Sequence, residues 1–91
     1  MRESKIEKEV CDYARKHHWL VYKFTSPGNR GVPDKIFIRN GAVFFIEFKA
    51  PNKTPSKLQK LIADRIKGEG IAVYTVDSIE YGKDIIDTYK L

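Results

Sequence analysis

The spacing of apolar residues predicts a helix near each end of the chain. Between residues 3 and 17 apolar side chains recur every three or four positions, on one face of an amphipathic helix: Ile6, Val10, Tyr13 and Ala14. Near the C-terminus Ser78 can cap a last helix, which would carry Ile79, Ile85, Ile86 and Tyr89. Gly82 lies inside this last segment and weakens its prediction, because glycine lowers helix stability.

Strands and turns alternate between residues 19 and 49. Residues 19–24 are rich in aromatic and β-branched side chains and predict a strand, and the turn formers in 25–31 predict a loop. Residues 34–39 predict a second strand, which Asn40-Gly41 turns back in a two-residue hairpin. The returning strand, 42–49, is apolar almost throughout and is therefore expected to be a central strand buried on both faces.

A middle helix and a last strand complete the pattern. Thr54 can act as N-cap with Pro55 at the first helical position, and glycines near 68–70 can end the helix. The apolar stripe of this helix consists of Leu58, Leu61, Ile62 and Ile66. Residues 71–76 follow as a strand. The order α-β-β-β-α-β-α predicts one α/β domain over residues 1–91, with a mixed four-stranded sheet flanked by helices.

Composition narrows the class of protein. No apolar run reaches the roughly 20 residues of a membrane helix, and the charged N-terminus lacks the apolar core of a signal peptide. Cys11 is the single cysteine, which excludes an internal disulfide and a cysteine-rich zinc site, so we expect a reducing cytoplasm. The net charge of +5 favours a polyanionic partner without identifying it.

Charged residues at the end of strand 42–49 are the first candidates for chemistry. Alternation places Glu47 and Lys49 on the same face of that strand. Burying charge costs several kcal/mol unless the charge is paired or binds a metal, so a functional role explains this pair better than chance placement. The alternative is a structural ion pair at the sheet edge.

Asp34 is expected beside Glu47, because the hairpin folds the start of one strand against the end of the next. Two neighbouring carboxylates repel each other unless a cation is present. Mg²⁺ is the expected cation, since it takes one or two carboxylates together with water and substrate phosphate. Considered alone, Asp34 could instead be an ordinary Pro-Asp turn residue.

These residues resemble a known nuclease fingerprint. Pro33-Asp34 followed by Glu47-Phe48-Lys49 is similar to the PD-(D/E)xK signature, and the order of elements resembles the core of that superfamily. The chain resembles more specifically the virus-type replication-repair nuclease (VRR-NUC) family, in the segments Gly31–Asp34 and Phe45–Pro51 and at Gln59. The resemblance covers nearly the whole chain and implies a restriction-endonuclease-like fold.

The resemblance also implies roles for individual residues. Asp34, Glu47 and the Phe48 carbonyl would hold the metal ion, either Mg²⁺ or Mn²⁺. Lys49 would position or activate the attacking water and stabilise developing negative charge. The family further has a glutamate in the first helix and a glutamine in the second, which correspond to Glu7 and Gln59. Without the resemblance, both would be read as solvated helix residues.

Basic residues near this site are candidates for binding phosphate. Arg30 lies in the loop 25–31, whose glycines permit close approach, and Lys53, Lys57 and Lys60 surround the start of the second helix. A merely solvated basic surface is the alternative for each of them. His17-His18 is a poor zinc site without further ligands, and we interpret both histidines as structural.

The sequence thus predicts a metal-dependent DNA endonuclease that hydrolyses phosphodiester bonds. The resemblance points to branched DNA of the kind met in DNA repair, with four-way (Holliday) junctions as the leading candidate. A C₂ homodimer would match the symmetry of such a junction, with exposed aromatic residues or the last helix around Ile85, Ile86 and Tyr89 as contacts. A non-catalytic nucleic-acid-binding module and an RNA endonuclease are alternatives on the same fold.

Overall fold

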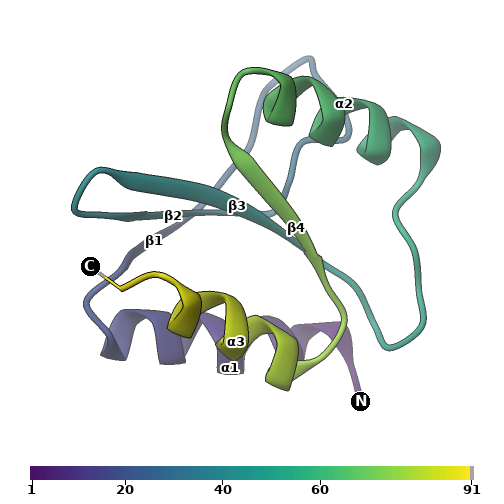
Figure 1. The fold of residues 1–91 in the computed structure, drawn as a ribbon. Coiled ribbons are helices and arrows are strands. Elements are labelled where there is room, and N and C mark those ends of the chain that lie inside the picture. Colours follow the sequence, from purple (N-terminus) through teal and green to yellow (C-terminus); the bar gives the residue numbers. More distant parts are fainter. Residues whose placement is uncertain (91) are drawn as a thin grey trace.

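The computed structural model describes residues 1–90, which form a four-stranded sheet between helices (Figure 1). The elements are α1 (Glu3–Lys16), β1 (Leu20–Lys23), β2 (Lys35–Arg39), β3 (Ala42–Phe48), α2 (Lys57–Gly68), β4 (Ala72–Val76) and α3 (Ile79–Thr88). Strands lie in the order β1-β2-β3-β4, antiparallel except for the parallel pair β3 and β4. The predicted order of elements and the mixed sheet are confirmed.

The β2–β3 hairpin determines which residues face each other across the two strands. Asn40 and Gly41 both adopt positive φ, 46° and 83°, as a type I′ turn requires. Lys35 consequently pairs with Ile46, and the Asp34 amide donates to the Ile46 carbonyl at 3.1 Å. The register places Asp34 opposite Glu47.

One face of the sheet packs against two helices. Figure 1 shows α1 and α3 side by side beneath the sheet, with α2 on the opposite side. The core lies between the sheet and α1 with α3, and includes Phe37, Phe44, Ile46, Phe48, Ile6, Val10, Trp19 and Cys11. Burial raises the pKa of the Cys11 thiol to about 11, which agrees with a packing role. Within residues 1–90, none of the helices combines the length and apolar character that crossing a membrane requires.

The predicted start of α2 is wrong by two residues. Ser56, not Thr54, is the N-cap: its side chain accepts from the Gln59 amide, and the Gln59 side chain accepts from the Ser56 amide. This reciprocal capping box needs Glu or Gln three residues after the cap. Thr54 has Lys57 at that position and cannot form it.

The apolar stripe of α2 is less buried than its periodicity predicts. Leu58 and Leu61 are 41% and 47% exposed, and α2 contributes no fully buried residue. The reason is that α2 lies mainly against β4 and covers only part of its side of the sheet. On the same side, Leu20 and Tyr22 of β1 stay more than half exposed.

Close packing between α1 and α3 explains the helical Gly82. A Cβ atom at this position would overlap the Val10 side chain, so only glycine lets the two helices approach. Ile85 and Ile86 of α3 are 4% and 3% exposed, since they face the core. The prediction of dimer contacts through these two isoleucines is therefore wrong.

Candidate functional site

The structure brings Asp34, Glu47 and Lys49 together where β3 ends. Asp34 precedes β2, and its Oδ2 accepts the Phe48 amide at 2.8 Å, which ties the carboxylate to the neighbouring strand. Glu47 and Lys49 extend toward the α2 side, and the Lys49 Nζ lies 3.2 Å from the Glu47 Oε2. The register of the hairpin and the alternation of side chains along β3 thus bring three charged groups together at the end of β3.

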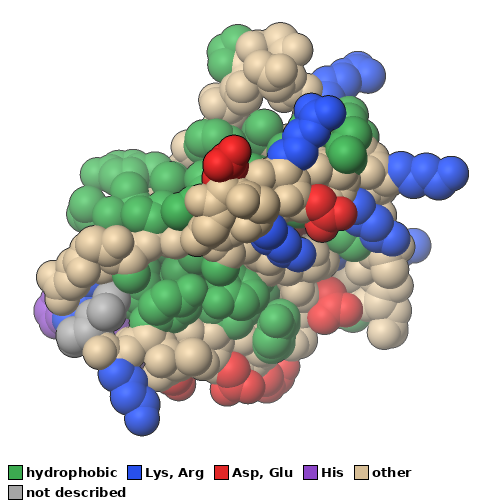
Figure 2. All heavy atoms as spheres, turned by 45° about the horizontal axis from the view of Figure 1, so that its top comes forward, with side chains coloured by type: hydrophobic (Ala, Val, Ile, Leu, Met, Phe, Trp, Pro, Cys, Tyr) green, Lys and Arg blue, Asp and Glu red, His purple; other side chains and the backbone are tan. Residues whose placement is uncertain are grey.

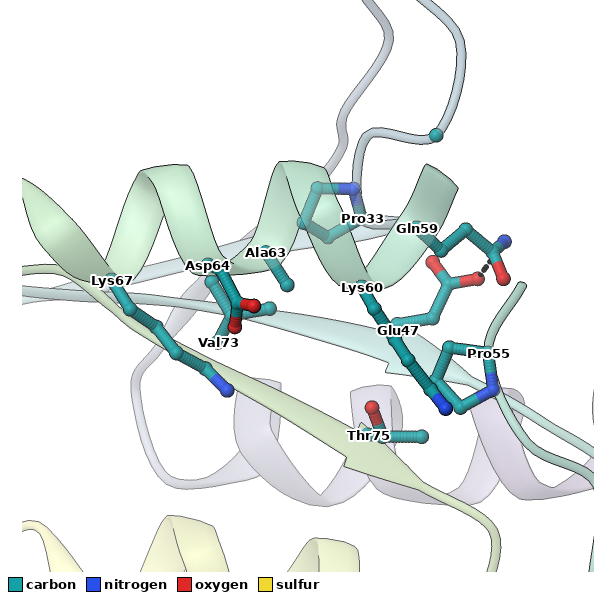
Figure 3. Close-up of a pocket in the computed structure, with 11 residues that line it drawn as sticks. Pro33, Glu47, Pro55, Gln59, Lys60, Ala63, Asp64, Lys67, Val73 and Thr75 are labelled. Atoms are coloured by element: carbon teal, nitrogen blue, oxygen red, sulfur yellow. Dashed lines mark hydrogen bonds between the residues drawn. The ribbon is translucent and has the colours of Figure 1, made fainter. Parts of the chain in front are cut away.

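Glu47 is the buried centre of this cluster, at 5% exposure. Its Oε2 accepts from the Gln59 Nε2 at 2.5 Å, the bond that Figure 3 draws between α2 and the strand below it. Its Oε1 is buried without a hydrogen-bond partner. Burial, followed by the negative charge of Asp34, raises the pKa of the Glu47 carboxyl to about 7, although Lys49 opposes the rise.

An unpartnered carboxylate oxygen beside a second carboxylate fits a cation site. A buried acceptor without a partner costs about 1–3 kcal/mol or more, which an oxygen-preferring cation would offset. Across residues 1–90, His, Cys, Asp and Glu side chains do not gather in the groups of three that many metal sites use. Two carboxylates with water and phosphate suit Mg²⁺, and the donor set therefore fits this ion.

Lys49 makes the ion pair that the structural alternative predicts, since its ammonium contacts Glu47 and its side chain is 18% exposed. An ion pair alone leaves the Glu47 Oε1 unexplained. The same ammonium can also act on a neighbouring phosphate, because Lys49 lies just beyond the end of β3, is partly exposed and carries three donors. Its position is compatible with both readings.

Of the two helical candidates, Gln59 reaches the site directly and Glu7 does not contact it through any observed hydrogen bond or ion pair in residues 1–90. The charge of Glu3, one turn earlier in α1, adds to the raised pKa of Glu47, whereas the charge of Glu7 acts on Cys11. Sequence reasoning missed Glu3, although its i, i+4 relation to Glu7 places both on one helix face.

A cavity of about 150 Å³ lies between α2 and the sheet, next to Glu47 (Figure 3). Lys60 and Lys67 from α2 and Thr75 from β4 line it, together with Pro33. Thr75 is the register partner of Glu47 on β4, a pairing that only the parallel sheet reveals. Neither Thr75 nor Lys67 belongs to a local sequence motif, so the sequence alone does not mark them as site residues.

The predicted phosphate-binding residues are all exposed: Arg30, Lys53, Lys57 and Lys60. Figure 2 shows Lys and Arg side chains spread over the right of the view, around α2, and a hydrophobic area at the left. Gly31 holds the loop that carries Arg30 against α2: a Cβ there would lie 2.9 Å from the Leu58 Cγ. The loop and the start of α2 therefore form one basic surface beside the carboxylates.

Comparison with known proteins shows which family the chain belongs to. No protein-family model matches the chain. It is 40% identical over 79 residues to the protein named "Putative nuclease p44" of Acyrthosiphon pisum secondary endosymbiont phage 1, and the match covers 86% of this chain and 85% of the phage protein. The chain belongs to the family of that phage protein.

The fold is that of VRR-NUC domains. A solved structure named "VRR_NUC domain" superposes with a TM-score of 0.88 at 24% sequence identity, over 99% of this chain and 100% of that chain. The resemblance to the VRR-NUC family noted in the sequence is thereby confirmed. Together the two comparisons support a nuclease of the VRR-NUC type.

Proposed function

We propose that this VRR-NUC protein is a metal-dependent DNA endonuclease that hydrolyses phosphodiester bonds in branched DNA. The observation that carries the proposal is the buried Glu47, whose Oε1 has no partner although Asp34 lies beside it and Lys49 contacts its other oxygen. A structural ion pair does not need an unpartnered oxygen. A site that takes up a cation does.

Each residue of the site has a defined part in this proposal. Asp34, Glu47 and the Phe48 carbonyl would hold Mg²⁺, or Mn²⁺ in its place, which supplies Lewis-acid polarisation of the scissile phosphate and a more acidic water. Lys49 orients the attacking water and stabilises the negative charge that develops on the phosphate. Gln59 holds the Glu47 carboxylate in place, whereas a part for Glu7 rests on the family resemblance alone.

DNA would be bound mainly through its phosphates. Arg30 and the lysines at positions 53, 57 and 60 are exposed beside the carboxylates, and the chain carries a net charge of +5. Such contacts position a nucleic acid without reading its sequence. They support binding to the backbone near a reacting phosphate, and the proposed place of this activity is the cytoplasm.

A homodimer would present two such sites to the two equivalent strands of a four-way junction. The surface that supports this part of the proposal is an open face of the sheet, formed by Leu20, Tyr22, Ile36, Ile38 and Val43. By strand alternation these side chains point away from the core, and they are cross-strand neighbours with no charged residue among them. Within the described part of the chain no helix covers them, since α2 contacts only β4 of the sheet. An uncharged apolar face suits a second copy better than it suits DNA.

The proposal is tested with labelled four-way junctions, linear duplexes and RNA, each incubated with Mg²⁺ or with EDTA. We expect junction DNA to be cut in Mg²⁺ and not in EDTA. Asp34→Asn should lose cleavage and keep DNA binding. Binding without cleavage by the wild type would identify a nucleic-acid-binding module, and cleavage restricted to RNA would identify an RNA endonuclease. Full activity of Asp34→Asn would contradict the proposed metal site.

A further inference from the structure

The side chain of Gln59 makes two hydrogen bonds that join the start of α2 to the proposed metal site. Its Oε1 accepts the Ser56 amide at 2.9 Å, and its Nε2 donates to the Glu47 Oε2 at 2.5 Å. The Ser56 Oγ in turn accepts the Gln59 amide at 3.1 Å. Ser56, Gln59 and Glu47 therefore form one continuous chain of hydrogen bonds.

The capping box determines which end of the Gln59 amide faces Glu47. An amide side chain can present either its oxygen or its NH₂ group to a neighbour. Because the Ser56 amide is a donor, it requires the oxygen of Gln59, which leaves the NH₂ group for the Glu47 carboxylate. A flipped amide would place two oxygens together at Glu47 and two N–H groups together at Ser56. The box thus selects the productive orientation.

We propose that Ser56 is a positioning residue for the metal site and acts through Gln59 on the Glu47 carboxylate. Ser56 is exposed and contacts neither carboxylate, so its effect would be indirect. Outer residues that hold a metal ligand commonly change metal affinity by 10- to 100-fold, and a residue one step further out is expected to change it less. The inference rests on the proposed function, since it presumes that Glu47 binds the ion.

The chain offers a matched control for simple helix capping. Ser78 caps α3 in the same way, with its Oγ accepting the Tyr81 amide at 3.2 Å. Ser78 belongs to no capping box that reaches a carboxylate, because Tyr81 occupies the position of Gln59. Removing either hydroxyl removes one helix cap. Only the Ser56 cap fixes the start of a helix whose N-cap backbone amide orients a side chain bonded to Glu47, so losing the Ser56 hydroxyl would loosen the Gln59 side chain indirectly.

The test measures Mn²⁺ binding directly, by calorimetry or by electron paramagnetic resonance, beside thermal unfolding and the Mg²⁺ concentration needed for half-maximal cleavage. We expect Ser56→Ala to weaken Mn²⁺ binding roughly 3- to 10-fold. Ser78→Ala should lower the unfolding temperature comparably without changing Mn²⁺ binding. Ser56→Thr, which keeps a hydroxyl cap, should restore the affinity. In a Gln59→Ala background the additional Ser56→Ala change should have no further effect on Mn²⁺ binding, because the intermediary is gone.

The outcomes separate this inference from the function on which it rests. Two results would overturn the positioning role and leave the nuclease proposal standing. The first is unchanged Mn²⁺ binding in Ser56→Ala. The second is that Ser56→Ala weakens Mn²⁺ binding as much in the Gln59→Ala background as it does in the wild type. A wild-type protein that binds no Mn²⁺ and cuts nothing would overturn both.

Discussion

At the scale of single residues, the ionised form of Glu47 destabilises the fold and is also the form that can bind a cation. Burial raises the pKa of its carboxyl to about 7 from an ordinary value of 4.5, so the ionised form is disfavoured in the folded chain. A group whose folded pKa lies above its unfolded pKa contributes stability that is fully present below the unfolded value and is lost as the pH rises through the folded one. Above pH 7 the Glu47 carboxylate is therefore ionised and ready for a cation, and its charge is then most costly to the fold.

We predict that Glu47→Gln stabilises the metal-free protein at pH 8, by roughly 1–3 kcal/mol. Urea unfolding in EDTA should show the two proteins converging as the pH falls from 8 toward 4.5. Added Mg²⁺ should stabilise the wild type and leave Glu47→Gln almost unchanged. Equal stability of both proteins at pH 8 in EDTA would mean that the Glu47 charge is compensated by groups already present.

Lys49 can be assigned to catalysis or to ion pairing by substitution. If its ammonium stabilises charge on the phosphate, Lys49→Ala should lower the cleavage rate by about 10² or more while Mn²⁺ binding and folding persist. Lys49→Arg, which keeps the charge but changes its geometry, should retain part of the activity. The measurement is single-turnover cleavage at saturating enzyme. A loss of stability with little loss of rate would assign Lys49 to the ion pair alone.

At the scale of elements, the sequence predicted those features that neighbouring residues determine, such as the hairpin turn. Asn40-Gly41 predicted the hairpin and with it the approach of Asp34 and Glu47, because a two-residue turn determines the register of its own strands. The position of Thr75 beside Glu47 could not be predicted in this way, since a parallel pair is joined by a crossover and its register is set by packing. The α2 cap was misplaced for a related reason: Thr54-Pro55 is a good helix start by propensity, and the hydrogen bonds of Ser56 outweigh it.

Gly82 gives a test of helix packing. Alanine favours helices over glycine by about 1 kcal/mol, yet Gly82→Ala should destabilise the protein by about 1–3 kcal/mol, because its Cβ would overlap Val10. Gly68→Ala is the matched control: Gly68 ends α2 with open space around it, and its substitution should be neutral or slightly stabilising. Chemical denaturation measures both. A stabilising Gly82→Ala would show that α1 and α3 can separate at little cost.

At the scale of the whole molecule, the sheet has one covered face and one that α2 covers only in part. The amphipathic patterns of α1 and α3 predicted their burial, but the pattern of α2 suggested more cover than the structure provides. Periodicity shows which side of a helix is apolar and not how much of a sheet that side spans. The open face around Leu20 and Tyr22 is therefore a feature that only the assembled fold reveals.

The proposed dimer can be tested at this face. Light scattering should give twice the 10.5 kDa chain mass for the wild type and the single-chain mass for Tyr22→Lys, because a charge there opposes burial. Tyr81 is exposed to a similar degree on α3, so Tyr81→Lys serves as the control and should stay dimeric. Junctions labelled on each strand should show paired opposing cuts for the dimer and unpaired nicks for Tyr22→Lys. A monomeric wild type that cuts linear duplex as fast as junctions would refute the dimer.

The two-residue turn at Asn40-Gly41 also limits how this chain can change in length over evolution. Asp34 and Glu47 are cross-strand neighbours because the residues between them divide evenly about the turn. An insertion of two residues at the tip, one for each strand, would lengthen the hairpin and keep the carboxylates opposite each other on the same face. An insertion of one residue would shift Glu47 to the core side unless a bulge absorbed it. We therefore expect related chains that keep the site to differ at the hairpin by even numbers of residues. The loop that carries Arg30 lies outside the β2–β3 register and can differ by any number.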